Sequence, residues 1–150
     1  MNENIPENHI SHLVTNIIEH LDPEKTPKEI EVNNKTFKTK VLLQPMILAL
    51  IEEKYQIEEL ERLCKEDDIY KELSDNTDLD LETLTLFKKE QQELIREALL
   101  RTMIVGSNMD VLDLKEYGVD NSNFEKVGPE RGQTLLAIIR HVNNIMKENF

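Results

Sequence analysis

The sequence predicts a mainly α-helical protein, a helical bundle of about five to six helices with one small β-hairpin after the first helix. Over most of the chain, apolar residues recur at spacings of three and four, which places them on one face of a helix. Glycine and proline are scarce, at four and five among 150 residues, so long irregular stretches are not expected. Residues 29–41 alternate instead between apolar and polar side chains, as paired strands do. The length fits one domain spanning 1–150.

The first helix is expected over Glu7–Leu21, where the apolar residues line one face. Asp22–Pro23 should end it, because the residue before a proline avoids the α region.

The β-hairpin is expected over 29–41. Apolar and charged residues alternate on both sides of Asn33–Asn34, and asparagine tolerates the positive φ that tight hairpin turns require. An isolated hairpin is only marginally stable in water, so it should pack on the helices or pair with a strand of a partner. Its apolar side chains are therefore the predicted partner-binding residues: Ile30, Val32, Phe37 and Val41.

The middle of the chain is rich in leucine and isoleucine. Pro45 suits the first turn of a new helix, where its missing N–H costs nothing. The pattern over 45–73 does not decide between one bent helix and two or three short ones, although Asp67–Asp68 is a suitable cap. A loop is expected over Ser74–Asp80.

The C-terminal half should begin with a long helix over Leu81–Val105, ended by Gly106 in a left-handed cap. A short helix over 110–117, an irregular stretch over 120–132 and a last helix over 133–147 should follow. The predicted apolar face of this last helix consists of Leu135, Leu136, Ile139, Val142 and Met146.

Composition limits the classes of partner. The net charge is −12, from 30 acidic and 18 basic residues, so phosphate backbones and acidic membrane surfaces are repelled. Direct nucleic-acid binding is therefore disfavoured, whereas a basic protein partner is allowed. One cysteine cannot form an intramolecular disulfide, and no apolar run approaches the roughly 20 residues that span a bilayer. With no secretory signal at the N-terminus, the cytoplasm is the expected location.

Motifs for phosphate and calcium binding are incomplete. Gly128 and Gly132 are separated by three residues where a phosphate-binding loop has four, and Gln133 replaces its lysine. The acids over 75–82 fit no register of a calcium-binding EF-hand, so helix capping is the favoured interpretation.

Nucleophilic and metal-binding chemistry also lacks support. Cys64 follows Ile57 and Leu60 at helical spacing and has acidic neighbours that disfavour a thiolate, so it is predicted to be a small core residue. His9 and His12 are three residues apart, but no further ligand accompanies them, so a solvated position beside the apolar face is favoured over a metal site. We expect neither enzymatic activity nor a cofactor.

The stretch Glu29–Val41 is predicted to form a strand, an Asn–Asn turn and a second strand. A leucine-rich helical stretch over Leu42–Glu53 follows it. This unit resembles the beginning of small phage tail-assembly chaperones and related phage morphogenesis proteins. It covers about a sixth of the chain. The resemblance implies a helical adaptor of a phage particle or of its assembly line, located in the host cytoplasm or the virion, with no catalytic residues.

Two functional hypotheses follow. The first is a non-catalytic protein–protein interaction protein that forms a homo-oligomer or captures a helical partner. Its specific form would be a phage structural or tail or virion assembly factor. The alternative is a small acidic inhibitor that mimics nucleic acid and binds a basic host enzyme.

Overall fold

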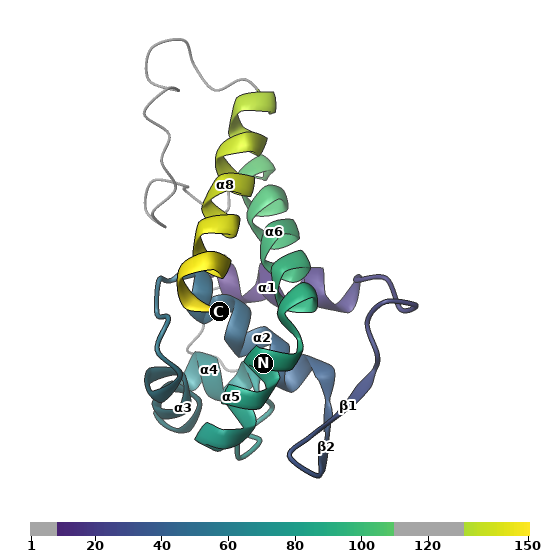
Figure 1. Ribbon diagram of the computed structural model, residues 1–150, viewed down its shortest axis with the longest axis vertical. Helices are drawn as coiled ribbons and strands as arrows, with labels where there is room; N and C mark the ends of the chain where they lie inside the picture. The colour runs from purple at the N-terminus through teal and green to yellow at the C-terminus, as the bar shows by residue number, and fades with distance from the viewer. Residues whose placement is uncertain (1–8, 110–130) are drawn as a thin grey trace.

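The computed structural model describes residues 9–109 and 131–150 and confirms the mainly helical fold with a hairpin after the first helix (Figure 1). Within these ranges the chain forms seven helices, more than the five to six expected, and two strands. The elements are α1 (Ile10–Glu19), β1 (Glu29–Val32), β2 (Lys35–Lys38), α2 (Thr39–Ile51), α3 (Ile57–Glu66), α4 (Asp68–Leu73), α5 (Leu81–Glu90), α6 (Gln92–Asn108) and α8 (Arg131–Asn149).

Helix α2 is the centre of the fold, with α1, α4 and α6 packed around it (Figure 1). Every residue of α2 except Lys40 is buried, as expected for a helix that is apolar on all sides. The predicted start at Pro45 is wrong, because α2 begins at Thr39 and Pro45 lies inside the helix. A continuous apolar run has no polar face, so its periodicity does not mark where the helix begins.

The hairpin pairs β1 and β2 in antiparallel register, with Ile30 opposite Phe37. Asn33 and Asn34 have φ angles of 55° and 62°, which confirms the predicted tight turn. The second strand ends at Lys38, so the expected strand up to residue 41 is wrong. Thr39 turns into the helix instead, and its backbone N–H donates to the carbonyl of Lys28 at 3.1 Å. This bond joins the first turn of α2 to the residue before β1.

Residues 57–73 form two helices that meet at Asp67. The Asp67 carboxylate accepts the backbone N–H groups of Ile69 and Tyr70 at 2.9 and 3.2 Å, which confirms the predicted cap. The long helix predicted from Leu81 is instead two helices, α5 and α6, because the backbone bends at Gln91. The stretch 88–92 has no apolar side chain that would pack a straight helix against the core, so the bend exposes little apolar surface.

Helices α6 and α8 pack against each other and extend beyond the rest of the fold (Figure 1). Gly106 is buried inside α6, which continues to Asn108, so the predicted helix end at Gly106 is wrong. The predicted face of the last helix is also corrected. Its buried residues are Ile138, Val142 and Ile145, whereas Leu135 and Leu136 are exposed.

The C-terminal helix itself is confirmed and is slightly longer than predicted. Among the described elements α8 contacts α6 most extensively, so only a narrow seam of α8 is covered. The helix expected over 110–117 lies outside the described residues, as do residues 120–130 of the irregular stretch expected over 120–132. The last two residues of that stretch belong to α8 instead.

Candidate functional site

The hairpin side chains predicted to bind a partner face the core of this protein. Val32 and Val41 are 1% and 4% exposed and belong to the central hydrophobic cluster. Ile30 and Phe37 are half-buried and pack against the same cluster. The side chains of Val32 and Val41 are thus taken up by the core of this chain, whereas Ile30 and Phe37 keep part of their surface exposed, so partner binding stays a prediction for these two.

The outward face of the hairpin is polar. Glu29 and Glu31 on β1, and Thr36 and Lys38 on β2, are exposed, and Glu29 lies opposite Lys38 in the register. Lys35, near the turn, lies 3.9 Å from the carboxylate of Asp80 at the start of α5. This face therefore offers charge rather than an apolar docking surface.

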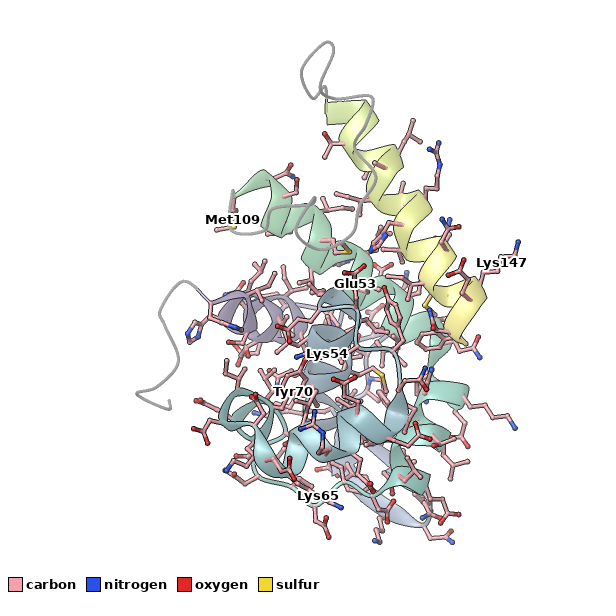
Figure 2. The ribbon with its side chains drawn as sticks, turned by 90° about the vertical axis from the view of Figure 1, so that its left-hand side faces the viewer. Glu53, Lys54, Lys65, Tyr70, Met109 and Lys147 are labelled. Carbon is pink, nitrogen blue, oxygen red and sulfur yellow. The ribbon has the colours of Figure 1, made fainter. Side chains whose placement is uncertain are left out.

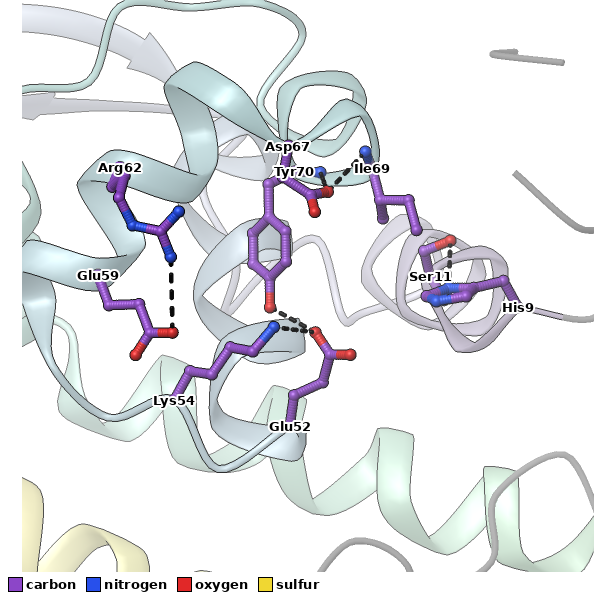
Figure 3. A network of polar contacts seen from close by, with 9 residues as sticks. All are labelled: His9, Ser11, Glu52, Lys54, Glu59, Arg62, Asp67, Ile69 and Tyr70. Carbon is purple, nitrogen blue, oxygen red and sulfur yellow. Dashed lines mark hydrogen bonds and ion pairs between the residues drawn. The ribbon is translucent and has the colours of Figure 1, made fainter. Parts of the chain in front are cut away.

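A polar contact joins the end of α2 to α4 (Figure 3). The Tyr70 hydroxyl donates to Oε1 of Glu52 at 2.6 Å, and Lys54 Nζ lies 3.6 Å from the same oxygen. Burial, followed by the hydrogen bond to Glu52, raises the pKa of Tyr70 well above its usual range. The phenol therefore remains a protonated donor, and the arrangement suits a structural contact better than proton transfer.

Cys64 lies in the core, as predicted, and is 5% exposed. Burial raises the pKa of its thiol to about 12, although a side-chain hydrogen bond with Ser74 partly opposes this effect. The thiol is therefore protonated near neutral pH, which does not suit nucleophilic chemistry.

One of the acids and one of the histidines considered as metal ligands, Asp80 and His9, act in helix capping. The Asp80 carboxylate accepts the backbone N–H of Thr83 at 2.8 Å, and His9 Nδ1 accepts that of Ser11 at 3.0 Å. Within residues 9–109 and 131–150, no three or more His, Cys, Asp and Glu side chains gather in a group suited to a metal ion.

The free end of the α6–α8 pair carries exposed hydrophobic side chains. Four large hydrophobic residues are exposed in the described ranges, and three of them lie here. Met109 is 62% exposed just after α6, and Leu135 and Leu136 are 41% and 60% exposed near the start of α8. The fourth, Leu81, is 38% exposed at the start of α5. In Figure 2, Met109 stands at the outer end of α6, away from the main body of the fold.

A groove lies between α6 and α8 at this end. Ile104, Leu135 and Ile138 form its apolar walls, with Asn108 and Thr134 at polar positions, and its volume is about 250 Å³. The two helices diverge toward these ends in Figure 2. We name these five residues together with Met109 and Leu136 the α6–α8 tip. The sequence pattern does not predict this tip, because it places both Leu135 and Leu136 on the buried apolar face of the last helix.

Comparisons with known proteins add no relative: no family model matches the sequence, and neither curated proteins nor solved structures give a significant match. None of the helices in the described ranges combines the length and the apolar composition needed to cross a bilayer.

Proposed function

We propose that this chain is a non-catalytic protein–protein interaction protein that binds a helix of a partner through the α6–α8 tip. The observation that carries the proposal is that Met109, Leu135 and Leu136, three of the four exposed large hydrophobic residues in the described ranges, lie at this end of the two helices, where Leu135 lines the groove. Contiguous exposed apolar surface typically marks an interaction site, whereas scattered single residues do not.

The groove favours a helix as the occupant. Two helices that diverge present an apolar channel, and an amphipathic helix fills such a channel with side chains spaced three and four residues apart. A volume of about 250 Å³ accommodates only a few side-chain groups, so the partner should insert one or two apolar anchors rather than a large ligand. Asn108 at the groove can hydrogen-bond the polar margin of the partner.

An assembly factor is the specific form of this function that we propose. Support comes from the resemblance of the hairpin and the leucine-rich helix after it to phage tail-assembly chaperones and morphogenesis proteins. Under this proposal the partner is a helical component of a phage tail or virion, or a second copy of the chain.

The alternative, an acidic inhibitor that mimics nucleic acid, requires rows of carboxylates without cationic neighbours. Helix α3 carries an acidic row, but Arg62 lies 3.2 Å from Glu66 and 3.9 Å from Glu59, and Lys65 lies 3.7 Å from Glu61. These pairs reduce the charge that α3 presents to a basic enzyme, so we favour the assembly proposal.

A site-specific photocrosslinker tests the proposal. A benzophenone side chain at position 136 should give a discrete adduct with one partner protein in the cells that naturally express the chain. The matched control is the same crosslinker at Leu81, which has a similar exposure to Leu135 but lies on α5. Adducts at both positions, or at neither, would contradict the proposal.

The double substitution Leu135→Ser with Leu136→Ser provides a second test. Both side chains are exposed, so the melting temperature should change little. Capture of the crosslinked partner should nevertheless fall at least tenfold, and Leu81→Ser should leave it unchanged. Undiminished capture by the double variant would contradict the role of the α6–α8 tip.

A further inference from the structure

Gln44 on α2 has one half of its amide without a partner. Its Nε2 donates to the carbonyl oxygen of Leu73, at the end of α4, at 2.9 Å. Its Oε1 is buried and has no hydrogen-bond donor within reach in the described part of the chain, and the residue as a whole is 5% exposed. A buried amide oxygen without a donor costs roughly 1–3 kcal/mol, so a ligand that brings an N–H group would recover that cost.

Gln44 lines a cleft between α1, α2 and α4 with a volume of about 260 Å³. Ser11 of α1 and Leu73 of α4 also line this cleft. At about 30 Å³ for each water molecule in the liquid, the space accommodates several waters or one long side chain. The cleft therefore differs from the α6–α8 tip both in its lining residues and in the helices that form it.

The charged residues of the cleft are mainly acidic. Three carboxylates, on Glu19, Glu72 and Asp75, line it together with one lysine, Lys40. Glu72 already has another interaction, so the charge available to a ligand comes chiefly from Glu19 and Asp75. The acidic margin favours a cation, and the unpartnered Gln44 oxygen favours a hydrogen-bond donor. Together they favour a cationic hydrogen-bond donor.

We infer that this cleft binds the guanidinium group of an arginine side chain presented by a partner protein. A guanidinium is planar and carries five N–H donors in a fixed fork, so one group can donate to more than one of the acceptors that line the cleft. An anion would be repelled by Glu19 and Asp75, and an ammonium group concentrates its three donors on one atom. The inference goes beyond the proposed function, because the cleft and the α6–α8 tip are built from different residues and either can fail alone.

The position of Asp75 is determined by the turn that ends α4. Asp75 and Asn76 have φ angles of 54° and 52°, and their backbone N–H groups donate to the carbonyls of Glu72 and Lys71 at 3.0 and 2.7 Å. These two bonds close α4 with a left-handed turn. Asparagine tolerates this conformation well, so Asp75→Asn removes the charge without disturbing the turn.

The test is an NMR titration of the ¹⁵N-labelled full chain with N-acetyl-arginine N-methylamide. We expect saturable shifts of the Gln44 side-chain amide and of the backbone amides of Ser11 and Leu73. The neutral isostere N-acetyl-citrulline N-methylamide should bind at least tenfold more weakly, and N-acetyl-lysine N-methylamide several-fold more weakly. Equal binding of the citrulline compound would overturn the charge requirement, and equal binding of the lysine compound would overturn the assignment to guanidinium.

Matched variants locate the binding. Glu19→Gln with Asp75→Asn should weaken binding of the arginine compound about tenfold. The control pair Glu31→Gln with Glu58→Gln removes the same charge from exposed positions outside the cleft and should leave the affinity unchanged. Gln44→Met, which keeps the volume but removes the acceptor, should also weaken binding. No saturable shift with the intact chain, or equal losses in both charge pairs, would overturn the inference.

Discussion

The hydroxyl of Tyr70 on α4 donates a 2.6 Å hydrogen bond to the Glu52 carboxylate at the end of α2. Tyr70 is 2% exposed, and Lys54 Nζ lies over its ring at 5.5 Å from the centroid. The phenol therefore meets a carboxylate at its hydroxyl and a cation above its ring (Figure 3). Because α2 is the central helix, this contact fixes α4 to the centre of the fold.

Tyr70→Phe should lower the free energy of unfolding by about 1–2 kcal/mol, because it removes a hydrogen bond to a charged acceptor and leaves the ring packing intact. Urea unfolding of the wild type and the variant measures this difference. Glu52→Gln and the double variant complete a cycle, and a coupling energy near zero would contradict a direct interaction.

Cys64 should resist thiol reagents while the protein is folded. Burial raises the pKa of the thiol to about 12, so the thiolate that attacks Ellman's reagent is scarce at pH 8. We expect the folded chain to react at least a hundredfold more slowly than the chain in denaturant, monitored by absorbance. Rapid modification of the folded protein at pH 8 would show that Cys64 is accessible. Cys64→Ala supplies the background rate.

Glu53 should be replaceable by glycine with a gain in stability. Its φ angle is 63°, and the N–H groups of Glu53 and Lys54 donate to the carbonyls of Leu50 and Ala49 in the bonds that end α2. Glycine adopts this left-handed conformation without the steric cost of a Cβ atom, so Glu53→Gly should raise the free energy of unfolding by about 0.5–1 kcal/mol.

The control for this variant is Glu58→Gly, inside α3, where glycine should lower the free energy of unfolding by about 1 kcal/mol. The two substitutions remove the same side chain, so opposite signs in urea unfolding isolate the backbone effect. A loss of stability in both variants would contradict the role of the left-handed turn.

Local chemistry predicted those parts of the fold that depend on neighbouring residues. The turn at Asn33–Asn34 and the cap at Asp67 follow from side chains that favour a single backbone geometry. The start of α2 was not predictable in this way, because the apolar run over 41–51 lacks the polar face that shows a helix boundary. The bend at Gln91 lies in a polar stretch without glycine or proline, so the sequence pattern predicts one continuous helix there.

The candidate sites were harder to predict than the fold. The groove at the α6–α8 tip joins Ile104 to Leu135, residues far apart in sequence whose meeting depends on how two helices cross. One signal was present: Leu135 and Leu136 are adjacent, and adjacent residues on a helix are about 100° apart, so one narrow seam cannot bury both. The unpartnered Oε1 of Gln44 has no signature in sequence, because the amide is oriented by the hydrogen bond from its Nε2 to the Leu73 carbonyl, 29 residues away along the chain.

His141 on α8 should make stability depend on pH. Its Nε2 is buried and has no hydrogen-bond partner among the described residues, and burial lowers the pKa of the imidazole below its usual value near 6.5, an effect that the Glu53 carboxylate partly opposes. Below pH 6.5 the unfolded chain binds a proton that the folded chain binds only at lower pH. Stability from this group is therefore complete above pH 6.5 and is lost as the pH falls toward the lowered pKa.

Urea midpoints at pH 5.5 and 7.5 measure the effect. The wild type should lose more stability between these values than His141→Leu, which has no imidazole to protonate. Glu53→Gly should enlarge the loss, because the opposing carboxylate is gone. The variant differs from the wild type only at this side chain, so the difference between their pH dependences isolates His141. Equal pH dependence of the wild type and His141→Leu would show that burial of Nε2 does not hold the imidazole neutral in the folded chain.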